Sequence, residues 1–90
     1  MPIARYNKQL AAQEHLLSGS PLTDLEAQVY FGMPNIAALI SQLRRVGWVI
    51  HSRSIPMEKL LVRINKHAVV VPHPKLPVQE IRHTEYWLSR

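Results

Sequence analysis

The amino-acid sequence predicts an α+β fold in which three short helices are followed by a small antiparallel β-sheet. Apolar residues recur at helical spacing up to Gly47, they alternate along the chain after it, and glycines or prolines separate the successive segments. Ninety residues without cysteine suit one domain, residues 1–90, with a helical core and first strand over residues 1–53. Residues 54–90 are expected to form an extended wing and a C-terminal strand or short helix.

The first two helices are predicted from their capping residues. Asn7 is a good N-cap, and the first helix is expected to run from it through KQLAAQEHLLS to Gly19. Thr23 and Glu26 have the spacing of a capping box, in which each side chain binds the other residue's backbone N–H. The second helix is expected to end at Phe31, because the glycine and proline of FGMPN form a tight turn.

A third helix is predicted over residues 35–46, with Asn35 as its N-cap and Gly47 at its end. Apolar residues at the i, i+3, i+4, i+7 spacing mark the side that packs on the core. The opposite side carries small, polar and cationic side chains and no acidic one. The core side consists of Ile36, Leu39, Ile40 and Leu43. The opposite side consists of Ala38, Ser41, Gln42 and Arg45, flanked by Ala37 and Arg44.

The chain after Gly47 is predicted to form strands. WVIHSR alternates between two faces, LLVRIN and HAVVV are two further strand candidates, and NK between them suits a tight hairpin turn. Residues 55–59 are expected to form the loop at the wing tip, since Pro56 disfavours a central strand. PHPKLP is expected to be an extended connector. The tail VQEIRHTEYWLSR favours a strand by its alternation, with a short helix as the alternative.

The positive charge is confined to the middle of the chain. The net charge is +5, and residues 27–79 hold seven basic side chains against one acidic side chain, Glu58. Such an excess attracts phosphate polymers or anionic membranes, and the alternative is a solvated basic surface. No apolar stretch approaches the roughly 20 residues of a membrane span, and the N-terminus lacks the apolar core of a signal peptide. We therefore expect a cytoplasmic protein with no membrane partner.

The two helices around FGMPN form a helix-turn-helix pattern, whose second helix enters the major groove of DNA. With the β-hairpin that follows, the pattern predicts a winged helix. Ala38 and Ser41 keep the outward side slim, Gln42 can pair with adenine, and Arg44 or Arg45 can pair with guanine or phosphate. The alternative is an amphipathic helix whose polar side is only solvated, but such a helix usually mixes charges of both signs.

The run LTDLEAQVYFGMPNIAALISQLRRVGWVIHSR resembles the small winged helix-turn-helix proteins common in phage and prophage genomes. Their pattern has an LT-x-x-E-A opening, an FG turn, an I-x-x-LRR-x-G reading helix and an aromatic Y-x-L ending. The matching residues are Leu22, Thr23, Glu26, Ala27, Phe31, Gly32, Ile40, Leu43, Arg44, Arg45, Gly47, Tyr86 and Leu88. The resemblance covers residues 22–53 well and the rest loosely, since residues 54–77 exceed a minimal wing. It implies sequence-specific DNA binding on the nucleoid of a bacterial host cell, for transcription regulation or control of excision.

The expected DNA-binding residues extend from the third helix into the wing. Asn35 lies at the positive end of the helix dipole, where a base edge or phosphate is expected. Basic wing residues are expected to hold phosphates or enter a minor groove, and the alternative is a charged ribbon edge that prevents aggregation. Lys66 is the weaker candidate among them. The full set is Asn35, Ala38, Ser41, Gln42, Arg44, Arg45, Arg53, Lys59 and Arg63.

Neither an enzyme nor a bound cofactor is expected. No histidines pair at i, i+4 on a helix, there is no cysteine to bind a metal, and Asp24 and Glu26 are used in helix capping. The expected partner is double-stranded DNA, bound by a homodimer that pairs through the TEYWLSR tail. The competing class is an adaptor or inhibitor that binds a host or phage protein through HAVVV and the aromatic tail. A third class is a protein that binds RNA or single-stranded nucleic acid by stacking its bases on Trp48, Tyr86 and Trp87.

Overall fold

The computed structural model describes residues 7–89. The N-terminal stretch in which no signal peptide is expected, residues 1–10, therefore lies mostly outside the described residues. The α+β class is confirmed. None of the helices within residues 7–89 is long and apolar enough to cross a membrane. The elements in chain order are α1 (Lys8–Leu17), β1 (Leu22–Thr23), α2 (Asp24–Phe31), α3 (Ile36–Arg45), β2 (Ile50–Pro56), α4 (Met57–Ile64) and β3 (Arg82–Leu88).

The first three helices begin at the predicted capping residues. The Asn7 side chain accepts a hydrogen bond from the backbone N–H of Leu10 at 3.0 Å. At the start of α2, Thr23 Oγ1 accepts from the Glu26 N–H at 3.2 Å, and Glu26 Oε1 accepts from the Thr23 N–H at 3.0 Å. Asn35 Oδ1 accepts from the Ala38 N–H at 3.3 Å. These bonds satisfy backbone donors that a helix start leaves open.

Gly47 ends α3 and turns the chain toward β2. Its φ of +104° lies in the left-handed region that side-chain-bearing residues rarely adopt. The Gly47 N–H donates to the Arg44 carbonyl at 3.2 Å, and the Trp48 N–H donates to the Leu43 carbonyl at 3.0 Å. This pair of bonds is a Schellman motif, which closes the carbonyl end of a helix. The direction of α3 relative to the sheet is therefore set by a defined turn.

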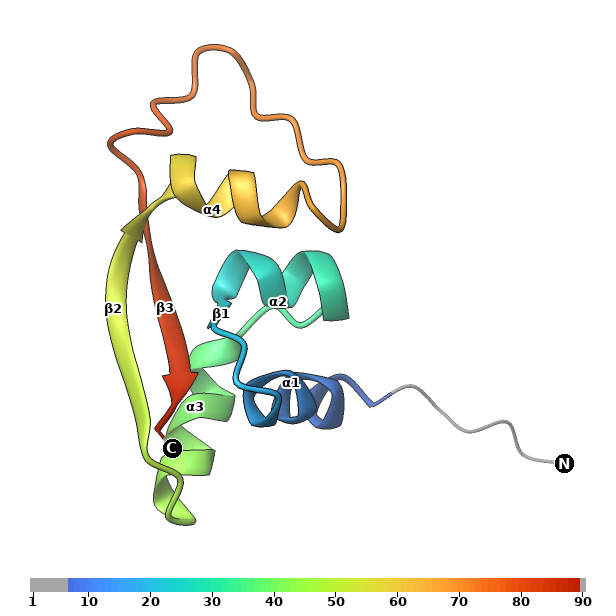
Figure 1. Ribbon diagram of the computed structural model, residues 1–90, viewed down its shortest axis with the longest axis vertical. Helices are drawn as coiled ribbons and strands as arrows, with labels where there is room; N and C mark the ends of the chain where they lie inside the picture. The colour runs from blue at the N-terminus through green and yellow to red at the C-terminus, as the bar shows by residue number, and fades with distance from the viewer. Residues whose placement is uncertain (1–6, 90) are drawn as a thin grey trace, which may run out of the picture.

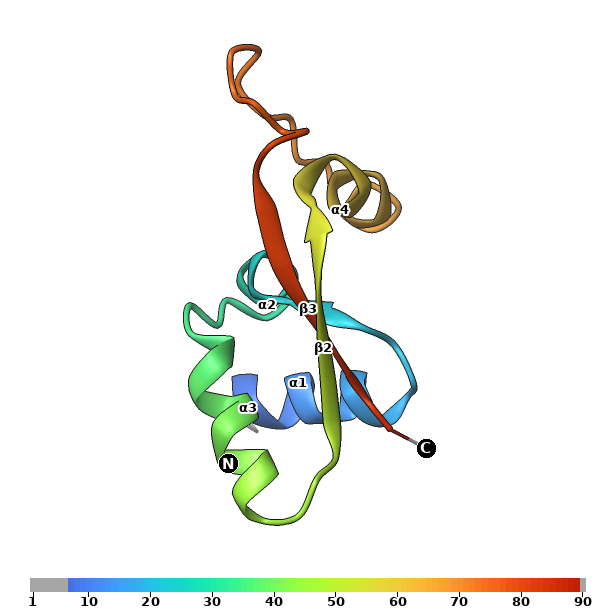
Figure 2. The same cartoon turned by 90° about the vertical axis from the view of Figure 1, so that its left-hand side faces the viewer.

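The sheet has the strand order β1-β3-β2, and both pairings are antiparallel. Leu22 lies opposite Tyr86, and β2 pairs with β3 from Ile50 opposite Leu88 to Pro56 opposite Arg82. The tail is a strand, as its alternation predicted, and the short-helix alternative is wrong. Figures 1 and 2 show β2 and β3 running along the longest axis of the molecule, with the helices on one side of them.

The main hydrophobic core lies between α1, α2, α3 and the sheet. α3 contributes the most to it, because all four residues of its predicted core side are buried. Partly buried Phe31, Trp48, Tyr86 and Leu88 pack against this cluster, so Trp48 and Tyr86 contact the core. The buried members are Ala12, Leu16, Leu22, Ala27, Met33, Ile36, Leu39, Ile40, Leu43 and Ile50.

Residues 57–81 differ from the predicted wing. α4 replaces the expected tip loop at residues 55–59 and the expected strand LLVRIN, while HAVVV forms turn and irregular chain. The predicted hairpin at NK is wrong for the same reason. PHPKLP contains no helix or strand, but it is not extended throughout, because residues 74–76 form a turn in which the Leu76 N–H donates to the His73 carbonyl at 2.9 Å. β2 continues to Pro56, whose ψ of 144° keeps the chain extended up to the first residue of α4.

α4 forms because its apolar residues have helical spacing. Met57, Leu60, Leu61 and Ile64 follow the i, i+3, i+4, i+7 pattern, and the last three of them are buried. They lie outside the main core cluster. Pro56 comes immediately before the helix, where its missing N–H breaks no intrahelical hydrogen bond. The gain from burying this stripe outweighs the strand preference of the branched side chains.

Candidate nucleic-acid interface

The outward side of α3 is a continuous exposed surface. Ala38, Ser41, Gln42 and Arg45 are all exposed and follow the i, i+3, i+4, i+7 spacing. On the opposite side of the helix, Ile36, Leu39, Ile40 and Leu43 are at most 5% exposed. One side of α3 is therefore packed on the core, and the other side is accessible to a ligand. Six of the nine sequence-predicted DNA-binding residues, 35, 38, 41, 42, 44 and 45, are brought together here.

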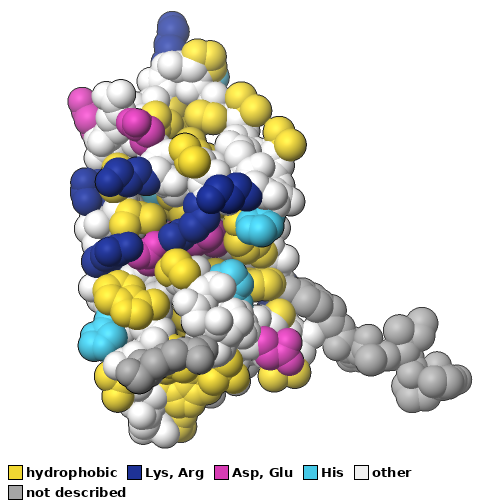
Figure 3. Space-filling model, viewed as in Figure 1, with side chains coloured by type: hydrophobic (Ala, Val, Ile, Leu, Met, Phe, Trp, Pro, Cys, Tyr) yellow, Lys and Arg dark blue, Asp and Glu magenta, His cyan; other side chains and the backbone are white. Residues whose placement is uncertain are grey.

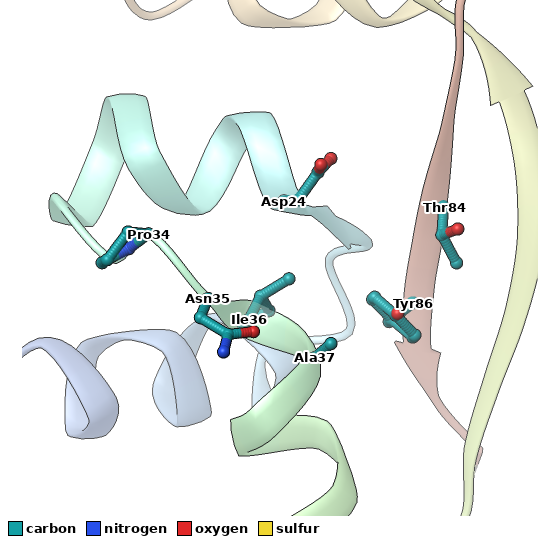
Figure 4. A pocket seen from close by; sticks show the side chains of 7 residues that line it. All are labelled: Asp24, Pro34, Asn35, Ile36, Ala37, Thr84 and Tyr86. Carbon is teal, nitrogen blue, oxygen red and sulfur yellow. The ribbon is translucent and has the colours of Figure 1, made fainter.

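A hollow of about 210 Å³ lies beside the start of α3, as Figure 4 shows. The Asn35 side chain is used there to cap the helix. Asp24 also lines the hollow, and its Oδ1 atom lies 2.8 Å from Nδ1 of His83. Because a carboxylate disfavours a bare phosphate, this end of α3 suits polar contacts more than phosphate binding. The complete lining is Asp24, Pro34, Asn35, Ile36, Ala37, Thr84 and Tyr86.

The two arginines at the end of α3 have different surroundings. Arg44 donates from Nε at 3.2 Å and from Nη2 at 2.6 Å to the carbonyl oxygen of Ile50, the first residue of β2. Its guanidinium thus ties the helix end to the sheet and is only partly available to a ligand. Arg45 is exposed, and no side chain among residues 7–89 forms an ion pair with it. Arg45 is consequently the freest cation on this helix.

The cations predicted in the wing are dispersed. Arg53, on β2, donates from Nε to Glu85 Oε1 at 2.7 Å and lies 5.5 Å from the centre of the Trp87 ring, although 66% of its side chain is exposed. Lys59 is exposed on α4. In both Figure 1 and Figure 2, α3 and α4 lie toward opposite ends of the longest axis. The structure therefore does not bring Lys59 and α3 together.

Arg63 is held by two buried carboxylates, which sequence reasoning did not foresee. It donates from Nε to Glu26 Oε2 at 2.9 Å, from Nη2 to Glu26 Oε1 at 2.5 Å, and from Nη1 to Glu85 Oε2. Glu26 is 2% exposed and Glu85 is 1% exposed. The expectation that Arg63 holds a phosphate conflicts with this geometry, because its guanidinium already joins α4 to α2 and β3.

The opposite charges of this cluster shift the pKa values of Glu85 and Arg63. Burial alone raises the pKa of Glu85, but the hydrogen bonds and charges of Arg63 and Arg53 outweigh it and hold that pKa below its ordinary value. Burial alone lowers the pKa of Arg63, and the two carboxylates reverse the effect, so that its pKa is raised. We call Glu26, Arg63, Glu85 and Arg53 the buried charge cluster. Figure 3 shows Lys or Arg and acidic side chains side by side on this face of the molecule.

The histidines do not assemble into a metal-binding group. Within residues 7–89, no three His, Asp or Glu side chains converge in a way that could hold a metal ion. His15 instead donates from Nε2 to the Pro21 carbonyl at 2.9 Å, and its ring lies edge-on to the Phe31 ring. His67 lies edge-on to the Tyr30 ring. These two histidines therefore belong to an aromatic contact between α1, α2 and the end of α4.

Comparison with models of known protein families, with curated proteins and with solved structures finds no match to this chain.

Proposed function

We propose that this protein is a winged helix-turn-helix protein that binds double-stranded DNA sequence-specifically through the outward side of α3. The order helix, strand, helix, helix, strand, helix, strand contains the elements of a winged helix in sequence with α4 inserted between the last two strands, and this order and the strand order β1-β3-β2 support the winged-helix assignment. The short turn of residues 32–35 between α2 and α3 supports the helix-turn-helix assignment. In this proposal, α4 and residues 65–81 stand where a minimal wing has a short loop.

The observation that carries the proposal is the shape and charge of the outward side of α3. A helix of 10 residues is about 15 Å long, and the major groove is about 12 Å wide, so a helix enters it only with small or matched side chains. Ala38 and Ser41 supply the small side chains. Gln42 can bond both the N6 and N7 atoms of adenine, and Arg45 can bond the O6 and N7 atoms of guanine. α3 contains no acidic residue that would repel phosphates.

The other cations are assigned supporting roles. Arg44 and Arg53 each keep part of the guanidinium exposed, and both are proposed to contact phosphates while they hold the sheet in place. Arg63 is left out, since its guanidinium is enclosed in the buried charge cluster. The proposed setting is the bacterial cytoplasm, where a phage or prophage regulator or excision factor would act as a homodimer on two half-sites. The proposal requires no catalytic step and no cofactor.

The direct experiment is selection of bound sequences from a random duplex pool, followed by affinity measurements on the selected duplex. Arg45→Ala is expected to weaken binding to the selected duplex by about 1–3 kcal/mol if Arg45 contacts a base. Lys59→Ala removes the same charge from an exposed position on α4 and serves as the matched control, with an expected change below about 0.5 kcal/mol. Enrichment of no sequence in the pool, or equal losses in the two variants, would contradict the proposal.

A further inference from the structure

Two valines between α4 and β3 are almost fully exposed. Val69 is 88% exposed and Val71 is 82% exposed, and no other large hydrophobic side chain within residues 7–89 is exposed to the same degree. Both lie on the arch that leaves α4 and returns to the sheet (Figure 1). Single exposed apolar residues are common, but two alternate valines on one strand-like segment form an apolar ridge. Nothing in the proposed DNA-binding mechanism uses this ridge.

The unpaired backbone donors of residues 69–73 belong to alternate residues. In an extended chain, the N–H groups of alternate residues point in the same direction. The Val70 N–H donates to Asn65 Oδ1 at 2.8 Å, and the next two even-numbered residues, Pro72 and Pro74, have no N–H. The odd-numbered Val69, Val71 and His73 have no acceptor for their backbone N–H groups among the described residues. The free donors therefore follow the i, i+2, i+4 spacing of a strand edge.

The two prolines favour an extended backbone in this segment. A residue that precedes proline is driven out of the helical region, so Val71 before Pro72 and His73 before Pro74 favour extended backbone angles. Valine itself prefers strands. The segment therefore loses less conformational entropy when it pairs with a partner strand. HAVVV forms no strand among residues 7–89, and it pairs with neither edge strand of the sheet, β1 or β2.

The positive charge around this segment favours an acidic partner. Residues 59–79 contain no Asp or Glu, and their exposed cations are Lys59, Lys66 and Lys75, since Arg63 is paired with Glu26 and Glu85. Lys66 and Lys75 flank the segment, one before and one after it, and both are exposed. Pairing of two copies of this segment would bring like charges together, which disfavours a homodimer at this site. An acidic partner strand would instead gain from both lysines.

We propose that residues 69–73 are a docking site for an extended, acidic segment of a partner protein, which adds to the Val69–Val71–His73 edge as a β-strand. Strand addition supplies main-chain affinity, and the alternate valines supply contacts for apolar side chains of the partner. A nucleic acid is the less favoured occupant, because its phosphates would offer no apolar surface to the two valines. The site is separate from α3, so the docking proposal does not depend on DNA binding.

The test is a titration of the isotope-labelled full chain, followed by amide NMR, with a blocked heptapeptide of alternating glutamate and valine. Saturable shifts and slowed hydrogen exchange are expected at the amides of Val69, Val71 and His73. The control peptide has lysine in place of each glutamate, and it is expected to bind much more weakly. Absence of saturation with the acidic peptide at about 1 mM, or equal binding of the lysine peptide, would overturn the proposal.

Three variants refine the test. Val71→Pro removes one donor while it keeps an apolar side chain, and it is expected to weaken the peptide by roughly fivefold. Val69→Ser is expected to weaken binding several-fold, whereas Val62→Ser, the same change at a 66% exposed position on α4, is expected to leave it unchanged. Equal effects of the two serine variants would contradict the docking site. Shifts of these three amides on addition of duplex DNA in place of the peptide would assign the segment to nucleic-acid binding and refute the proposal.

Discussion

Replacement of Arg63 by methionine leaves Glu26 and Glu85 buried without the cation that joins them. Breaking a buried ion pair by removing one partner costs about 3–5 kcal/mol, since the remaining charge stays desolvated. Two features place Arg63→Met at the lower end of that range. The Arg63 side chain is 28% exposed, and Glu85 keeps its bond from Arg53. We therefore expect a loss of about 3 kcal/mol, which corresponds to a fall in Tm of about 12–24 °C for a domain of this size.

The pH dependence of this loss separates lost charge from lost packing. In the wild-type chain the pKa of Glu85 is lowered from 4.5, so its stabilisation is fully present above pH 4.5 and is lost as the pH falls through the folded-state pKa. In Arg63→Met, Glu85 loses one of its two cationic partners, so that its pKa rises relative to the wild-type chain. The free-energy difference between wild type and variant is therefore largest near pH 7 and becomes smaller as the pH falls toward 4.

The assay is urea unfolding of both proteins at several pH values between 4 and 7, with the free energy of unfolding extrapolated to water. Arg53→Met is the matched control, because the Arg53 side chain is 66% exposed and its pair with Glu85 is expected to contribute below about 1 kcal/mol. A loss in Arg63→Met that is constant across this pH range would refute the charge argument, and so would equal losses in the two variants.

Three further predictions concern single elements of the fold and the interface. If Arg44 and Arg53 each neutralise one phosphate, log affinity for duplex DNA falls with log salt at a slope of about −1.8, a loss of about 12-fold between 50 and 200 mM; a slope near zero would contradict the assignment. Gly47→Ala is expected to cost about 1 kcal/mol in urea unfolding, because φ is +104° while the added methyl group meets no atom within 4 Å; an unchanged stability would contradict the turn geometry. Leu60→Ala is expected to cost about 2–5 kcal/mol, because Leu60 is fully buried; a loss below about 1 kcal/mol would show that α4 does not pack on the body of the domain.

The helical half of the fold was predictable because its signals are local. Asn7, Thr23 with Glu26, and Asn35 cap the helices in which they were placed, and Gly47 ends α3 as expected. Capping requires only residues a few positions apart, so the sequence carries the whole interaction. The buried and exposed sides of α3 follow from the helical periodicity of its 10 residues, which is also a local signal.

The second half was harder to predict because its determinants are distant in sequence. The leucines and valine of LLVRIN suit either a strand or a helix, and only the spacing that includes Met57 and Ile64 indicated α4. Glu26 and Arg63 are 37 residues apart, and no local pattern joins them to Glu85. An arginine beside the apolar stripe of an amphipathic helix was the one available signal for the buried charge cluster. Because this signal was not used, Arg63 was wrongly assigned to phosphate binding.

The central claim is that the outward side of α3 contacts duplex DNA. The most direct measurement is amide NMR of the labelled chain with and without the selected duplex, read residue by residue along Ile36–Arg45. We expect the largest shifts at Ala38, Ser41, Gln42 and Arg45, with small shifts along α4. Unchanged amides on α3 at a saturating concentration of a duplex that binds the chain elsewhere would contradict it.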